Sequence, residues 1–175
     1  RRGLKISAST VIGPFQDASA WPDIENQIIQ GGELVAPIGA THIVLIDDIY
    51  SSSSARASKV PARLDDRAWK QLIETTHRAA DLVRDRFGLE PTFHPCADTH
   101  VEYEEQIETF LEQTDPSRVA LCLDTGHHAY RGGDPVEFMR KYHERVSYLH
   151  LKSPDRAMLE KVKREGVDAV IVTST

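Results

Sequence analysis

Cysteine is scarce in this sequence, with only Cys96 and Cys122 among 175 residues. So low a content excludes a fold held together by disulfide bonds, and it makes a reducing cytoplasm the expected compartment. Long hydrophobic runs are missing too, because no apolar stretch approaches the ~20 residues that a membrane-spanning helix needs. The first residues lead into a short strand-like run without the apolar segment or cleavage site of a signal peptide. We therefore expect a cytoplasmic protein with no membrane partner.

An excess of positive charge is also absent. The 21 Lys and Arg residues are interspersed among 27 Asp and Glu residues, which gives a net charge of −6. Without a basic stripe, a nucleic acid is not an expected partner. The remaining composition, 40% hydrophobic and 27% charged, is that of an ordinary globular protein that buries a core.

Apolar runs alternate with amphipathic helical segments along the chain. The run Thr-His-Ile-Val-Leu-Ile at 41–46 is rich in β-branched residues, as in a strand that is buried on both faces. Gly88 marks a helix end, and Asp134-Pro135 marks a helix start with Pro at the first helical position. We predict strands at 4–11, 41–46, 90–94, 119–124, 146–151 and 167–172, helices at 21–40, 67–87, 103–113, 134–142 and 154–165, and a polar loop at 51–59.

This order predicts an α/β fold of five to six (βα) units, because strict alternation implies a parallel sheet with right-handed crossovers. Two arrangements are compatible with the pattern, an open doubly wound sheet and a closed barrel. A full eight-fold barrel needs about 250 residues. A barrel made by 175 residues would therefore be a partial one.

Two of the predicted strands end on ionisable side chains. Asp124 and His127 close the strand at 119–124, and His150 and Lys152 lie in and just after the next one. Ligands of repeated β/α proteins gather at the carboxyl ends of parallel strands. An aspartate and a neutral histidine arriving there from neighbouring strands suit a divalent metal ion. Because residues two apart in a strand share a face, we expect His150 and Lys152 to share one cavity.

Four motifs occur in order: Phe-His-Pro-Cys-Ala-Asp-Thr-His-Val-Glu at 93–102, Leu-Cys-Leu-Asp-Thr-Gly-His at 121–127, Gly-Gly-Asp-Pro at 132–135 and Leu-His-Leu-Lys at 149–152. With these motifs the chain resembles the xylose-isomerase-like TIM-barrel superfamily of sugar phosphate isomerases/epimerases. Within it, the chain is most similar to inosose (2-keto-myo-inositol) dehydratase-like proteins. The likeness covers about residues 64–152. It implies one (βα)-repeat TIM-barrel domain over 1–175, a partial barrel that lacks the first and last barrel units.

The resemblance implies a metal site with Asp124 and His150 as ligands. A third ligand, Glu102, would reach in from the start of the helix that follows the strand at 90–94, unless His94 takes that place. Mn²⁺, Co²⁺, Mg²⁺ and Zn²⁺ all remain open. Two departures from the family pattern stand out, since Cys96 and Asp98 occupy positions where those proteins have His and Gly. We also find no counterpart of the fourth ligand, a Glu from the last barrel strand.

The reaction implied is isomerisation, epimerisation or dehydration of a sugar or cyclitol through a metal-bound enediolate. His94, His127 and Lys152 are the expected acid, base and substrate-binding groups. His127 would contact a substrate hydroxyl or carbonyl, and Lys152 would stabilise an enolate or act as an acid. The three outcomes share one intermediate, so the sequence does not choose among them. Barrels of this kind commonly associate, and a homo-oligomer is compatible with the sequence.

Several of these residues have simpler explanations. Asp124 could cap the following loop or helix. Glu102 could be a carboxylate at a helix N-terminus, where the helix dipole favours negative charge. His150 could be an ordinary core residue. Cys96 is expected to be a small loop residue. The alternation of its strand directs Cys122 into the core, where it is expected to be inert. Strand, helix or loop surfaces are the expected places of the other histidines, which are His42, His77, His100, His128 and His143.

Three other functions compete with the enzyme. A non-catalytic carbohydrate-binding or regulatory barrel would keep the fold and lose part of the metal site. A metal-dependent endonuclease on the same scaffold would need a basic surface, which the acidic balance opposes. A flavodoxin-like binding module would need a phosphate loop after the first strand, and the residues at 9–14 make a poor one.

Overall fold

The computed structural model describes residues 3–50 and 63–165. Their strands form one sheet in the order β1-β2-β3-β4-β5, and each neighbouring pair is parallel. A doubly wound sheet changes direction at a switch point, whereas a barrel adds its strands in sequence order. The prediction of an α/β barrel is therefore confirmed over the doubly wound alternative. The strands are β1 (Ala8–Gly13), β2 (His42–Asp47), β3 (Glu90–Phe93), β4 (Ala120–Asp124) and β5 (Val146–His150).

The sheet curls strongly enough for its two ends to meet. The Tyr148 hydroxyl on β5 lies 2.5 Å from Oγ of Ser7, just before β1. The rings of Tyr148 and His42 on β2 lie 4.7 Å apart. Strands at opposite ends of the sheet can touch in this way only across the concave face of a curved sheet, which is the inside of a barrel.

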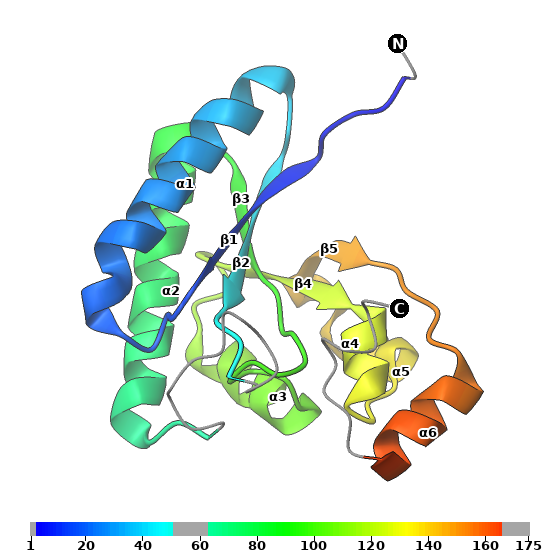
Figure 1. Cartoon of the computed structure of the whole chain (residues 1–175). Coiled ribbons are helices and arrows are strands. Elements are labelled where there is room, and N and C mark those ends of the chain that lie inside the picture. Colours follow the sequence, from blue (N-terminus) through cyan, green and yellow to red (C-terminus); the bar gives the residue numbers. More distant parts are fainter. Residues whose placement is uncertain (1–2, 51–62, 166–175) are drawn as a thin grey trace.

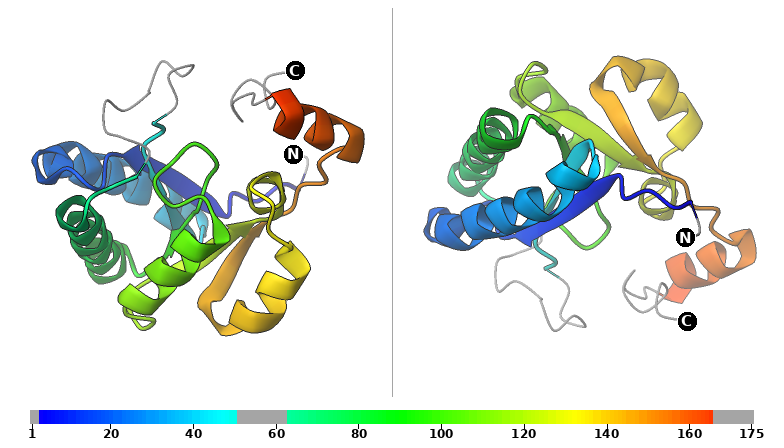
Figure 2. Two further views of the ribbon diagram at one scale, coloured as in Figure 1. Left: turned by 90° about the horizontal axis from the view of Figure 1, so that it is seen from below. Right: turned by 90° about the horizontal axis from the view of Figure 1, so that it is seen from above.

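Helices cover the outer face of the sheet (Figures 1 and 2). The predicted helices are present, and α1 and α2 lie side by side against β1 and β3 (Figure 1). Their bounds are α1 (Trp21–Val35), α2 (Asp66–Phe87), α3 (Glu104–Gln113), α5 (Pro135–Tyr142) and α6 (Arg156–Glu165), with short 3₁₀ turns at Ala18–Ala20, Ala36–Ile38 and His143–Arg145. A further short helix, α4 (Thr125–Tyr130), was not predicted.

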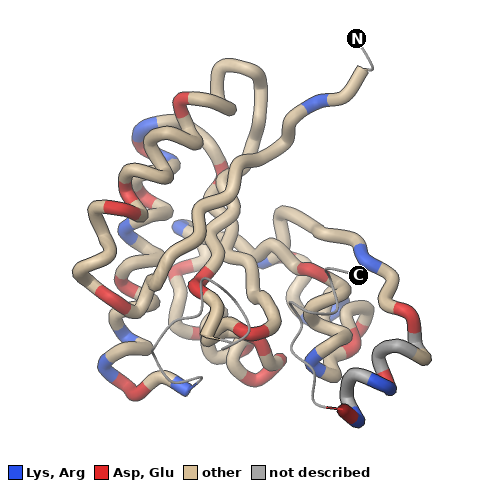
Figure 3. Tube along the Cα trace, in the orientation of Figure 1, with Lys and Arg blue, Asp and Glu red and all other residues tan. Residues whose placement is uncertain are grey.

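Helix α2 was predicted well because its sequence contains capping residues at both ends. The Asp65 carboxylate accepts a hydrogen bond from the Ala68 amide at 2.8 Å, as an N-cap residue does. At the other end Gly88 has a left-handed φ of 63° and its amide donates to the Arg84 carbonyl, as in a glycine C-cap. Acidic and basic residues are interspersed along this helix (Figure 3), in line with the balanced composition.

Two predicted boundaries were wrong by about four residues or more. The first strand begins at Ala8 and not at residue 4, because its partner β2 offers register positions only from His42 onward; Leu4 is 88% exposed. The first long helix ends at Val35 and not at residue 40, because the chain turns through the Ala36–Ile38 segment and Gly39 adopts a φ of 85°. The predicted loop at 51–59 and strand at 167–172 lie outside the described residues.

The hydrophobic core lies between the sheet and the helices. Phe93 at the end of β3 stacks on Phe110 of α3 with ring centroids 4.2 Å apart, and meets Phe15 edge-on at 6.2 Å. This packing holds the carboxyl end of β3 against α3 and against the segment that follows β1, because close-packed aromatic cores resist displacement. Within the described ranges, no helix has the length and apolarity needed to cross a membrane.

Candidate active site

The carboxyl ends of β3, β4 and β5 bring five of the predicted residues together. His94 directly follows β3, Asp124 ends β4 and His150 ends β5. Asp124 and His150 are paired across the ladder, so their side chains emerge at the same level. His127 lies in α4, and Lys152 lies two residues beyond β5. The structure thus joins residues that are up to 58 positions apart in sequence, from 94 to 152.

Asp124 uses its two carboxylate oxygens for different purposes. Oδ1 accepts hydrogen bonds from the amides of Gly126 at 2.9 Å and His127 at 3.0 Å, so it caps α4 as the simpler explanation proposed. Oδ2 faces the site, 2.7 Å from Nζ of Lys152 and 3.4 Å from Nδ1 of His150. The structural and functional interpretations of Asp124 are therefore compatible.

The carboxylate of Asp124 is held in its ionised form. Burial alone would raise its pKa, but the hydrogen bonds from His94 and Lys152, together with the amide of His127, keep the pKa well below its usual range. Asp124 is 1% exposed. A buried anion with cationic and N–H partners on one oxygen is a strong position for a metal ion or a charged reaction partner.

His94 is buried, and its two ring nitrogens have different surroundings. Nε2 lies 3.5 Å from Oδ2 of Asp124, and its ring lies 4.8 Å from the ring of His150. Nδ1 is buried without a hydrogen-bond partner within the described part of the chain. Buried polar atoms are nearly always paired, so this imidazole nitrogen is available to bind a ligand.

His127 and Lys152 form the outer part of the site. Nζ of Lys152 lies 3.3 Å from Nε2 of His127, and Sγ of Cys96 lies 3.5 Å from the same nitrogen. Burial lowers the pKa of His127 to about 4, against the opposing effect of Asp124. His127 is therefore neutral near pH 7 and has a lone pair available as a base.

Thr125 and Gly126 fix the position of Lys152. The Thr125 hydroxyl accepts from the Lys152 amide and donates to the Lys152 carbonyl, both at 2.9 Å. A Cβ at Gly126 would lie 2.7 Å from Cβ of Lys152. Only a glycine therefore allows the lysine to approach this closely.

Glu102 lies in a separate cluster. Its Oε1 accepts a hydrogen bond from the Tyr50 hydroxyl, and its Oε2 accepts from the Asp98 amide at 2.8 Å and pairs with Nε of Arg131 at 2.5 Å. Arg131 also binds Oδ1 of Asp98 at 2.6 Å. Both oxygens of Glu102 are thus engaged, and its role as a metal ligand stays a prediction.

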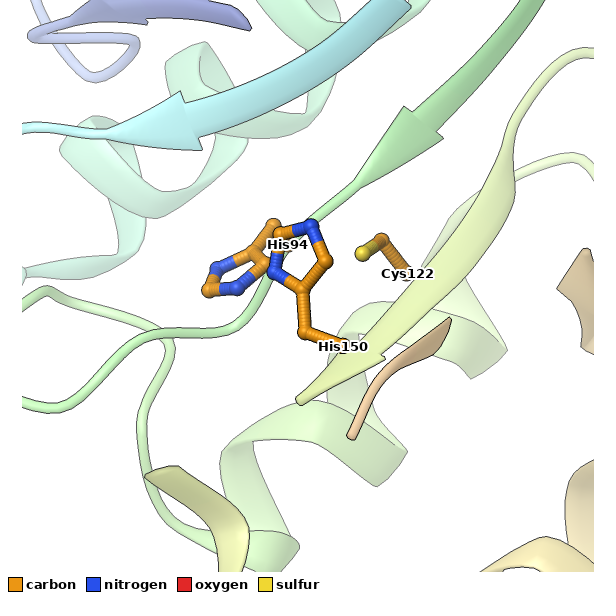
Figure 4. A group of neighbouring side chains, drawn as sticks. All are labelled: His94, Cys122 and His150. Carbon is orange, nitrogen blue, oxygen red and sulfur yellow. The ribbon is translucent and has the colours of Figure 1, made fainter. Parts of the chain in front are cut away.

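Among the residues that the structure describes, two groups of side chains could hold a metal ion. Within each group the donor atoms lie within 4.8 Å of one another. One group is His94, Asp124 and His127, and the other is His94, Cys122 and His150 (Figure 4). The second group includes a cysteine that the sequence indicated to be inert. The strand pattern already indicated that Cys122 lies near the site, because Cys122 and Asp124 are two residues apart and share a face of β4.

Two histidines expected on the surface are buried, and that expectation was wrong. His100 is 1% exposed, with Nδ1 2.5 Å from Oδ2 of Asp47 at the end of β2. His128 is 3% exposed and lies against the Phe138 ring, with Nε2 3.2 Å from Glu104. The sequence offered one clue to the first pair, since Asp47 ends a buried strand as Asp124 does.

The site and the sheet together define a TIM-barrel protein with ionisable side chains gathered at the carboxyl ends of its strands, and comparison with known proteins agrees. The family model of the xylose isomerase-like TIM barrel matches residues 1–168, so the chain belongs to that family and the resemblance is confirmed. The inosose dehydratase of Geobacillus kaustophilus (strain HTA426) is 41% identical over 170 residues, which cover 95% of this chain and 55% of the relative. The chain spans about half the length of the curated relatives it matches.

Solved structures show the same fold at low sequence identity. The 3-keto-D-glucoside 4-epimerase from E. coli matches with a TM-score of 0.66 and 14% identity over 95% of this chain and 70% of that one. The IolI protein, solved with a zinc atom, matches with a TM-score of 0.66 and 15% identity over 83% of this chain and 50% of that one. At these identities the likeness concerns the fold alone.

Proposed function

We propose that this chain carries the metal-binding half of an enzyme that converts a keto-polyol, with dehydration of an inosose as the preferred reaction. Isomerisation or epimerisation of a sugar begins with the same proton removal next to a carbonyl and is the related alternative. The observation that carries the proposal is Oδ2 of Asp124, 2.7 Å from the Lys152 ammonium and surrounded by three imidazoles. The inosose dehydratase relative supports the substrate class.

The residues present fit a divalent metal ion. Asp124, His94 and His150 provide one carboxylate and two imidazoles, and His94 Nδ1 is buried without a hydrogen-bond partner in the described ranges. This mixture of nitrogen and oxygen donors suits Zn²⁺, Co²⁺ or Mn²⁺ better than Mg²⁺, which prefers oxygen donors alone. When bound, such an ion would polarise the substrate carbonyl and acidify the neighbouring C–H.

His127 can then transfer the proton, and Lys152 can stabilise the negative charge. Neutral His127 is suited to take the proton from the carbon next to the carbonyl. The Lys152 ammonium, held beside it by Thr125, can stabilise the negative charge that develops on the oxygen of the enediolate. If the protonated His127 returns its proton to a β-hydroxyl, water leaves and the reaction is a dehydration. If the proton returns to carbon, the product is an isomer or epimer.

A matched pair of variants tests the proposal. Asp124→Asn removes the negative charge yet keeps an N-cap residue, because Asn caps helices as well as Asp does. Asp134→Asn makes the same change at the exposed N-cap of α5, where Asp134 accepts from Val136 and Glu137. We expect dehydration of 2-keto-myo-inositol and bound metal to be lost only in the first variant. Full metal content and turnover in Asp124→Asn would exclude the site, and sugar binding without turnover in the parent protein would favour the non-catalytic barrel.

A further inference from the structure

Cys122 lies one layer beneath the site in the barrel interior. It is fully buried and precedes Asp124 by two residues, so both side chains leave β4 on the same face. In the ladder Cys122 pairs with Tyr148, and Asp124 with His150. Tyr148 contacts His42 across the inside of the barrel. The thiol is therefore directed into the barrel and not into the helix layer outside it.

Two imidazoles converge on this thiol from the neighbouring strands. His94 follows β3 and His150 ends β5, and Figure 4 shows the His150 ring next to the Cys122 sulfur with the His94 ring on its other side. The three donor atoms lie within 4.8 Å of one another. Ligand atoms of one tetrahedral zinc ion are separated by about 3.3–3.6 Å, given metal–nitrogen and metal–sulfur bonds of about 2.0 and 2.3 Å. Small side-chain rotations would thus close the three donors around one ion.

The surroundings of His94 support its role as a ligand here. His94 is 3% exposed and its Nδ1 has no hydrogen-bond partner among the residues described. Nε2 of the same ring faces Asp124. His94 belongs to both candidate donor groups.

We propose that Cys122, His94 and His150 form a sulfur-containing metal site that overlaps the Asp124 site through His94. The thiol loses its proton to solvent as the sulfur–metal bond forms, and no other bond changes. A thiolate with two imidazoles selects zinc or cobalt(II) over manganese and magnesium, because soft donors favour softer ions. The inference rests on the proposed function in that both need a divalent metal at this end of the barrel.

Cobalt(II) spectroscopy tests the sulfur ligand without an activity assay. A thiolate bound to Co²⁺ gives a charge-transfer absorption in the near ultraviolet, whereas nitrogen and oxygen ligands do not. We expect this band in the parent protein loaded with Co²⁺ and its loss in Cys122→Ser and Cys122→Ala. Cys96→Ser is the matched control, since Cys96 is the other cysteine and lies beside His127; there the band should remain.

The outcomes separate the two proposals. Stoichiometric Co²⁺ without the band, or a band that vanishes in Cys96→Ser and persists in Cys122→Ser, would overturn the sulfur site while leaving a metal enzyme in place. Failure to bind any divalent ion would overturn both. As a second measurement, we expect Cys122→Ala to lower the affinity for Zn²⁺ by about tenfold or more, with little change for Mn²⁺. Equal losses for both ions would contradict the preference.

Discussion

Oδ2 of Asp47 lies 2.5 Å from Nδ1 of His100 and 3.2 Å from the His100 amide. Oδ1 of the same carboxylate accepts from the Phe15 amide. One buried aspartate thus ties the end of β2 to the loop after β3 and to the turn after β1. These are the segments that set the rim of the barrel next to the site.

We predict that Asp47→Asn destabilises the protein strongly. The substitution leaves a buried imidazole facing an amide, and a buried hydrogen-bonding group that loses its partner costs about 1–3 kcal/mol. The free energy of unfolding, measured by urea denaturation, should fall by that order. Asp85→Asn makes the same change at an exposed position of α2 and should alter it by less than about 0.5 kcal/mol. Equal effects would show that the Asp47–His100 pair has no special role.

The stability should also depend on His77 in mildly acidic solution. His77 accepts a hydrogen bond from the Asp115 amide at 3.0 Å, and burial, aided by Arg118, lowers its pKa. As the pH falls below the unfolded value of about 6.5, the unfolded state binds a proton that the folded state does not. The contribution of neutral His77 to the free energy of unfolding is therefore fully present above that pH. It decreases as the pH falls below that value, and it stops changing once the pH is below the folded pKa.

His77→Gln should flatten this part of the pH profile, because the amide oxygen of Gln accepts a hydrogen bond and does not titrate. Urea denaturation between pH 8 and 5 measures the effect. His143→Gln, at an exposed position after α5, is the control and should leave the slope unchanged. An unchanged slope in His77→Gln would assign the pH dependence to other groups.

Gly126→Ala tests the position of Lys152. The new Cβ would lie 2.7 Å from Cβ of Lys152, so the lysine must move away from Asp124. We expect turnover to fall by about a hundredfold, in line with an ångström-scale misplacement of a reacting group, while the protein stays folded. Gly31→Ala in α1 is the control, because its nearest atom is the rotatable Ser9 Oγ. Unaltered turnover in Gly126→Ala would remove Lys152 from the reaction.

Asp98 has the one non-glycine positive φ among the described residues, 67°, and binds Arg131. Substitution by Ala loses the ion pair and keeps the strained backbone, whereas Gly loses the pair and relieves the strain. We expect both variants to be less stable than the parent, with Gly more stable than Ala by about 1 kcal/mol. Thermal unfolding measures this order, and the reverse order would contradict backbone strain at residue 98.

The sequence predicted most of the strands and helices because their periods and end signals are local. It also predicted that Asp124 and His150 meet, since parallel strands in register place their ends together. Helix α4 was missed because its six residues are too few to show an apolar period. The Asp47–His100 pair is 53 positions apart, and no local pattern can report such a contact.

Cys122 shows a different limit of sequence interpretation. Strand alternation correctly placed it in the interior, and an interior cysteine is usually a small core residue. A barrel has two interiors, one between the sheet and its helices and one inside the sheet. Only the three-dimensional curvature decides which of them a buried side chain enters.

The two oxygens of Asp124 have a consequence for ligand affinity. Because Oδ1 is fixed by two amides of α4, the carboxylate cannot rotate freely and Oδ2 is aimed before any ligand arrives. A ligand that binds Oδ2 therefore loses little side-chain entropy there, so more of its interaction energy appears as affinity. The same two hydrogen bonds make the start of α4 part of the site. An ion whose radius does not fit would strain the carboxylate, and this strain would be transmitted to the backbone that carries His127.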